Sequence, residues 1–276
     1  MRRMWQPDVK WILSLLAIVA LGVSLLLATL FTLTRRETVV EATTLSYAVF
    51  LSGEKGLDSA DDVEALQTQL TTAPNQTIQP ISGFSISISL AEITGLTPRE
   101  ARLHVIRKFT EPIYDGGAEG LAQLATDEAL KAKILTSRMT LDLLSHKTHD
   151  RVRFWVQISL ALTALLTLLA MLFSYRFGRL ATAGWILLVG TLPGCLFWWL
   201  ISMRPPGLAA TGTAQITNVG TIFSFVASQV LPDRAQELFN WQRLIVISGA
   251  GLILLAIVGG LLFREKTKTD KPIAHP

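Results

Sequence analysis

The chain has 276 residues, of which 50% are hydrophobic and 17% are charged, and its mean hydropathy is +0.43. Soluble domains carry about 25% charged residues, so this composition excludes an ordinary soluble enzyme, a disordered polypeptide and a fibrous protein. The single cysteine excludes an intramolecular disulfide and a cysteine-rich zinc or iron–sulfur site, and the net charge of +4 does not indicate nucleic-acid binding, because membrane proteins gather Lys and Arg in their cytoplasmic segments.

The first predicted element is a membrane span over residues 11–33, which contains no Asp, Glu, Lys, Arg or His. A bilayer is crossed by about 20 apolar residues, whereas the apolar part of a secretory signal has about 7–15. We therefore expect an uncleaved anchor that follows a short tail, residues 1–10.

Residues 35–153 are polar enough to form a water-facing domain, with 13 basic and 16 acidic side chains. Apolar residues alternate with other residues along 44–52 and along 84–90, and this period of two predicts two strands. Capping patterns predict helices over 59–70 and from Thr97-Pro98-Arg99-Glu100 to about residue 110. Together these elements predict a small α+β domain inserted between the first and second spans.

The second span is predicted over 154–173, and no Gly or Pro occurs between residues 121 and 177. Two interpretations remain open for this region. Either one continuous helix runs from the domain into the membrane, or the helix breaks near residues 146–150.

The third and fourth spans are predicted over 183–203 and 244–263, again without an ionisable residue. A short loop, 175–182, precedes the third span, and a longer loop, 204–242, separates the two. This longer loop contains an uncharged apolar stretch, 215–231. We favour a helix lying on the membrane surface for that stretch, and the alternatives are a re-entrant segment or packing on the domain.

The arginines predict the orientation of the spans. Arg176 and Arg179 occupy the short loop without a neighbouring acid, which places that loop and both tails, 1–10 and 264–276, in the cytoplasm. Other arginines flank the opposite ends of the spans, but long domains cross the membrane largely regardless of charge. The sequence thus predicts a multi-pass protein of the cell membrane with an extracytoplasmic domain.

One polar cluster is a candidate metal site. Asp142, His146 and His149 are spaced by four and three residues, which places them on one face of a helix. Carboxylate and imidazole groups on one face are suitable metal ligands. The alternative is a cluster of solvated side chains at the membrane interface, because basic residues crowd the same region.

Small residues four apart are candidate helix-packing positions in the spans, since they let helix backbones approach closely. The predicted set consists of Ala20, Ser24, Ala28, Gly190, Gly194, Ala256 and Gly260.

The absence of ionisable residues from all four spans argues against a pump or a proton-coupled transporter. No common nucleophile, metalloprotease or nucleotide-binding motif occurs either, and no cofactor is expected. The leading hypothesis is a membrane fold, an all-α four-helix transmembrane bundle, that acts as a non-enzymatic accessory, assembly or scaffold factor. Besides the lipid bilayer, its expected partner is another protein or a second copy, bound through the membrane helices and the domain. The alternatives are a channel or transporter subunit that uses 215–231 and, in third place, a membrane-anchored hydrolase.

Overall fold

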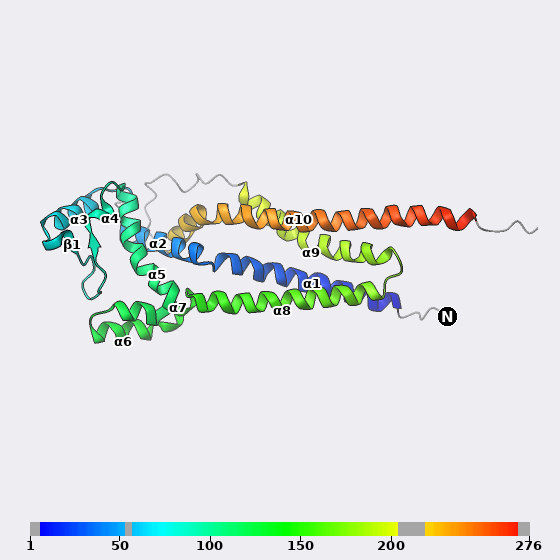
Figure 1. Cartoon of the computed structure of the whole chain (residues 1–276), viewed down its shortest axis with the longest axis horizontal. Coiled ribbons are helices and arrows are strands. Elements are labelled where there is room, and N and C mark those ends of the chain that lie inside the picture. The colour runs from blue at the N-terminus through cyan, green and yellow to red at the C-terminus, as the bar shows by residue number, and fades with distance from the viewer. Residues whose placement is uncertain (1–5, 53–56, 204–218, 270–276) are drawn as a thin grey trace, which may run out of the picture. The chain divides into compact units, whose positions relative to one another are not determined.

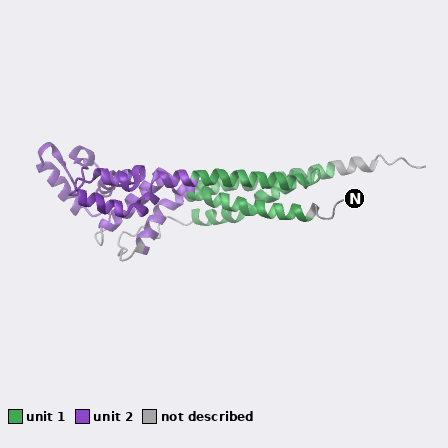
Figure 2. Ribbon diagram, turned by 90° about the horizontal axis from the view of Figure 1, so that it is seen from below, with its two compact units in different colours: residues 1–30, 153–203, 235–276 green, residues 31–152, 204–234 purple. Residues whose placement is uncertain are grey.

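The structure is a computed structural model that describes residues 6–52, 57–203 and 219–269 and is mostly helical (Figure 1). The chain forms two compact units, which Figure 2 shows in different colours. Unit 1 comprises Met1–Leu30, Arg153–Met203 and Ala235–Pro276, and unit 2 comprises Phe31–Val152 and Arg204–Arg234.

The long apolar helices are α1 (Gln6–Leu33), α8 (His146–Leu172), α9 (Gly178–Ser202) and α10 (Val219–Thr269). Each of the four is long and apolar enough to cross a membrane. All four predicted spans lie within these helices, to within a residue at their ends, so the prediction of a multi-pass membrane protein agrees with the observed helices.

The helices of unit 1 pack through small residues and a few branched ones. Ala17 and Leu21 of α1 form one buried cluster with Ala170 of α8 and Ile186 of α9. A second buried cluster joins Trp198 of α9 to Ala235 and Leu238 of α10. Because most of the outer surface of these helices is apolar, the bundle suits a hydrocarbon environment rather than water.

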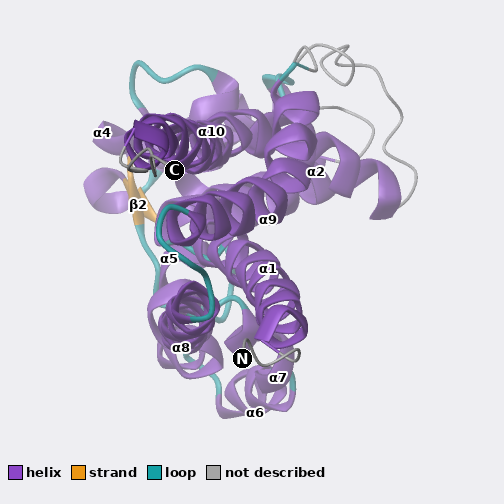
Figure 3. Ribbon diagram, turned by 90° about the vertical axis from the view of Figure 1, so that its right-hand side faces the viewer, coloured by secondary structure: helices purple, strands orange, loops and turns teal. Residues whose placement is uncertain are grey.

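Unit 2 consists mainly of helices, and the colouring of Figure 3 shows that helices make up most of the described chain. Its helices are α2 (Arg36–Ser52), α3 (Asp61–Thr72), the 3₁₀ turn η2 (Pro74–Gln76), α4 (Leu90–Ile93), α5 (Pro98–Leu124), α6 (Glu128–Thr136) and α7 (Arg138–Leu143). The strands β1 (Thr77–Ile78) and β2 (Ile88–Ser89) form an antiparallel pair, with Thr77 opposite Ser89 and Ile78 opposite Ile88.

The predicted strand over 44–52 is wrong, because this segment is the second half of helix α2. Leu45 and Val49, four residues apart, are buried, whereas Tyr47 and Leu51 are exposed. Four apolar residues at alternate positions therefore belong to two faces of a helix. Helical burial at intervals of three and four decides the structure here.

Of the predicted strand 84–90, only Ile88 and Ser89 lie in a strand, and Phe84 makes an isolated bridge to Ala125. Ile86 and Ile88 are both buried, so the alternation of apolar residues along 84–90 reflects an extended segment that is buried on one side. Unit 2 therefore does not show the predicted α+β domain, because a two-residue strand pair is its main sheet contact among the described residues.

The predicted start of α5 is confirmed, whereas its predicted end is wrong. Thr97 accepts a hydrogen bond from the backbone N–H of Glu100, and the Glu100 carboxylate accepts one from the N–H of Thr97. The helix then continues through Pro112 to Leu124 and is interrupted only at Gly117, whose φ is 61°. The long segment after it is broken, since α7 ends at Leu143 and α8 begins at His146.

One buried cluster of unit 2 joins two segments that are far apart in the sequence. Leu45 and Val49 of α2 and Ile106 of α5 pack against Val226 and Val230 of α10. The described part of the apolar stretch 215–231 is thus the start of a long helix that packs on the domain, and residues 215–218 lie outside the described residues.

Candidate functional site

A groove of about 490 Å³ lies in unit 1 and is lined by α1, α9 and α10. Helix α1 contributes residues from Ile18 to Thr29, and α9 contributes residues from Val189 to Trp198. Helix α10 contributes one residue, Gln242. The lining is apolar apart from Thr29, the indole N–H of Trp198 and this single amide. A cavity of this size with few polar groups resembles a small-molecule site.

Glycines shape the walls of the groove. A Cβ atom at Gly22 would meet no heavy atom within 4 Å, so this position faces open space. A Cβ at Gly190 would lie 2.8 Å from a methyl carbon of Leu21, and one at Gly194 would lie 2.8 Å from Oε1 of Gln242. The predicted packing pair Gly190 and Gly194 therefore admits two side chains of other helices, one apolar and one polar.

Gln242 is the unusual residue of this site. Its side chain is only 4% exposed, and its Oε1 has no hydrogen-bond partner among the described residues. The amide lies against Gly194, near the middle of the uncharged stretch 183–203. Burial of an amide oxygen without a hydrogen-bond partner raises the free energy of the folded state, and hydrocarbon offers no donor that could satisfy it. Sequence analysis did not single out Gln242, although its polar side chain next to an apolar span was a visible signal.

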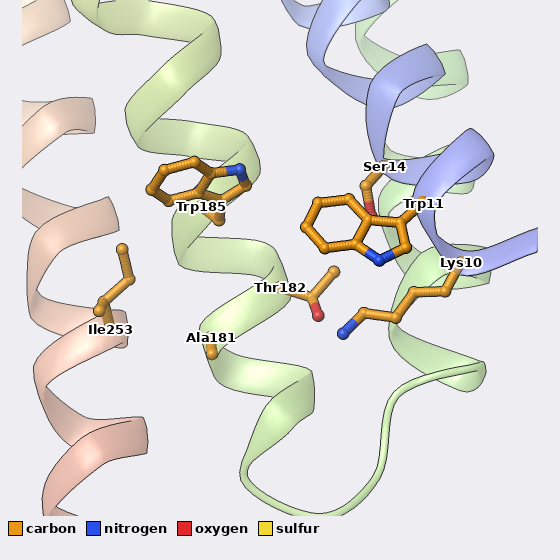
Figure 4. A pocket seen from close by; sticks show the side chains of 7 residues that line it. All are labelled: Lys10, Trp11, Ser14, Ala181, Thr182, Trp185 and Ile253. Carbon is orange, nitrogen blue, oxygen red and sulfur yellow. The ribbon is translucent and has the colours of Figure 1, made fainter. Parts of the chain in front are cut away.

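A second cavity of unit 1, of about 370 Å³, is lined by α1, α9 and Ile253 of α10 near the N-terminal end of α1 (Figure 4). Lys10 and Trp11 of α1 face Thr182 and Trp185 of α9 there. A lysine with tryptophans at the end of a span is typical of the interfacial region of a membrane.

Ser24 is a predicted packing residue that makes interhelical hydrogen bonds. Its hydroxyl bonds to the hydroxyls of Ser159 and Thr163 on α8, at 3.0 Å in the case of Thr163, and donates to the carbonyl of Ala20 at 2.8 Å. These contacts hold α1 and α8 together without an ionisable group. Hydrogen bonds of this kind between membrane helices contribute about 0.6–2 kcal/mol each.

The other predicted packing residues differ from one another in burial. Ala256 is buried, Ala20 and Ala28 are half-buried, and Gly260 is exposed with open space around it. One close backbone approach, between α9 and α10, involves a pair of glycines that the sequence interpretation missed. A Cβ on Gly184 would lie 2.6 Å from the carbonyl oxygen of Gly249, and one on Gly249 would lie 2.9 Å from that of Gly184.

The candidate metal ligands take up separate structural contacts. Asp142 accepts hydrogen bonds from the N–H of Ala118 at 3.2 Å and from Nε of Arg138 at 3.1 Å. The bond from Ala118 is the main cause of a lowered pKa of the Asp142 carboxyl. His149 stacks on Phe31 with ring centroids 4.5 Å apart.

His146 is the first residue of α8. Within residues 6–52, 57–203 and 219–269, no three His, Cys, Asp or Glu side chains are grouped as a metal ion would need. The structure therefore does not bring Asp142, His146 and His149 together as a ligand set.

Other charged residues of unit 2 join helix α5 to neighbouring segments of the same unit. Arg102 is buried and donates to the carbonyls of Leu57 at 2.7 Å and Ser59 at 3.2 Å. Lys108 of α5 pairs with Glu92 of α4, and this hydrogen bond lowers the pKa of the Glu92 carboxyl.

Comparison of the chain with protein families, with curated proteins and with solved structures finds no match.

Proposed function

We propose that this integral membrane protein is a non-enzymatic accessory, assembly or scaffold factor whose unit 2 lies outside the cytoplasm and binds a protein partner. The observation that carries the proposal is an apolar row on α6 and α7. Leu135, Met139 and Leu143 follow one another at intervals of four residues, and all are exposed, Met139 to 84%. Exposed apolar patches on a polar domain are typical of interaction surfaces.

The apolar row is distinct from the residues that pack these helices onto α5. Ile134 is buried in a cluster with Ala118 and Ala122, and Leu141 packs against the same cluster. The helices α6 and α7 therefore bury one set of apolar side chains and leave the row outside. Met139 adds a flexible, polarisable side chain, which suits contact with a partner.

The polar residues of unit 2 support a binding role rather than a catalytic one. Arg102 and Lys108 of α5 donate to the backbone carbonyls of Leu57 and Ser87, which lie outside the helices, and Arg36 pairs with Asp115. The channel alternative rests on 215–231, but Val226 and Val230 of this stretch are buried in unit 2. Their packing supports a structural role for the segment.

The test is crosslinking and co-purification of the full chain from its native membrane. We expect a specific protein to co-purify with the wild type and to be lost when the three residues of the apolar row are changed to serine. The matched control is Leu51→Ser, which changes an exposed apolar residue of α2 instead. A protein that purifies alone and conducts ions or solutes in liposomes would refute the proposal and favour the channel alternative.

The orientation needs a separate test. In a cysteine-free background with Cys195→Ala, single cysteines at Gln69 and Arg179 should react differently with a membrane-impermeant maleimide applied to intact cells. We expect labelling at Gln69, on unit 2, and none at Arg179, which lies at the start of α9 and belongs to the predicted cytoplasmic loop 175–182. Labelling at Arg179 alone would place both tails outside the cell.

A further inference from the structure

We propose that the groove lined by α1, α9 and α10 binds a neutral lipid that carries a hydroxyl group, and that Oε1 of Gln242 accepts the hydrogen bond of this hydroxyl. The inference is independent of the proposed partner binding, since all the residues that carry it lie in unit 1.

The lining selects an apolar and uncharged ligand. No Asp, Glu, Lys, Arg or His is among the residues that line the groove. An ionised headgroup inside it would lose its hydration without gaining a counter-charge, at a cost of several kcal/mol. A hydrocarbon chain that enters such a surface from the bilayer has no hydration to lose.

The groove is accessible from the side, where the bilayer lies. Leu26 of α1 and Phe197 of α9 both line it, and their side chains are 68% and 56% exposed. Along α1 the groove extends from Ile18 to Thr29, which is roughly 17 Å of helix at 1.5 Å per residue. This length and the open side suit a lipid chain lying along the helices.

Gln242 adds the requirement that the ligand carry a hydrogen-bond donor. Its oxygen is a hydrogen-bond acceptor that is buried and has no donor among the described residues. A hydroxyl is a donor without charge, so it satisfies this oxygen and suits the uncharged lining. Diacylglycerols and long-chain alcohols combine such a hydroxyl with an apolar body.

The test uses a photoactivatable diacylglycerol, with a diazirine in one acyl chain, and its methyl ether, in which the hydroxyl is blocked. The full chain is reconstituted in liposomes of phosphatidylcholine, and labelled peptides of residues 11–33 and 183–203 are quantified by mass spectrometry. We expect the hydroxyl lipid to label the groove at a concentration roughly three- to tenfold lower than the ether does, which is the contribution of one hydrogen bond.

Two variants separate the polar contact from the apolar one. Gln242→Leu should remove the difference between the two lipids and keep the labelling. Gly22→Leu places a side chain in the open space of the groove and should reduce labelling by both lipids. Gly260→Leu is the matched control, because a Cβ there also meets no heavy atom within 4 Å but the residue does not line the groove.

Equal labelling by the two lipids in the wild type would overturn the proposal, since Gln242 would then be satisfied by a trapped water and the groove occupied by ordinary lipid tails. Unchanged labelling in Gly22→Leu would overturn it as well. Thermal unfolding of each variant, followed by tryptophan fluorescence, checks that the helices of unit 1 are intact.

Discussion

Replacement of Gly117 by alanine should destabilise the C-terminal end of α5 and its packing against α7. Gly117 has φ 61° and ψ −140°, a backbone conformation that residues with a Cβ rarely adopt. Such strain costs about 1–3 kcal/mol. In addition, a Cβ at this position would collide with the carboxylate of Asp142, which accepts a hydrogen bond from Ala118.

The displaced carboxylate adds to the cost. A hydrogen bond to a charged group contributes about 1.5–3 kcal/mol, and the lower end applies here because Asp142 is partly exposed to water. Strain and the lost bond together give a local destabilisation of about 3 kcal/mol for Gly117→Ala. This free energy corresponds to a loss of roughly 100-fold in hydrogen-exchange protection.

The assay is hydrogen–deuterium exchange with mass spectrometry on peptides that cover residues 110–145. Tryptophan fluorescence does not report on this region, because no tryptophan occurs in 31–152. Gly116→Ala is the matched control, since a Cβ there meets no heavy atom within 4 Å and alanine favours the helix by about 1 kcal/mol. Equal protection in the two variants would refute the reasoning.

Three further predictions concern charge and helix packing. The pKa of Asp142 is lowered in the folded state, so the contribution of this carboxylate to stability is present at neutral pH and is lost as the pH falls below about 4. In circular dichroism melts, the melting temperature of Asp142→Asn should therefore decrease less over this pH range than that of the wild type. Ser24→Ala removes two interhelical hydrogen bonds and should cost about 1 kcal/mol in SDS unfolding followed by tryptophan fluorescence, whereas Ser248→Ala, which removes a bond within one helix, should cost less. Gly249→Leu forces α9 and α10 apart and should cost about 1–3 kcal/mol in the same assay, and an equal effect of Gly260→Leu would contradict this explanation.

The candidate site was only partly visible in the sequence. Gly190 and Gly194 were identified from their spacing, and both lie on the wall of the groove. Gln242 was missed because its lack of a hydrogen-bond partner depends on what α9 places opposite it. Gly184 and Gly249 were missed for the same reason, since a close approach belongs to a pair of helices and neither sequence segment contains it alone.

The sequence by itself determined the four helices that are long and apolar enough to span a membrane, and the cap of α5, because each follows from a local property. An uncharged run of about 20 residues forms a helix in hydrocarbon whatever surrounds it, and a Thr-Pro-x-Glu start satisfies its own N–H groups. Tertiary structure alone decided the secondary structure of 44–52 and the packing of Val226 and Val230 in the core of unit 2. Their apolar residues fit more than one periodicity, and only burial against a distant segment of the chain selects the helix that is observed.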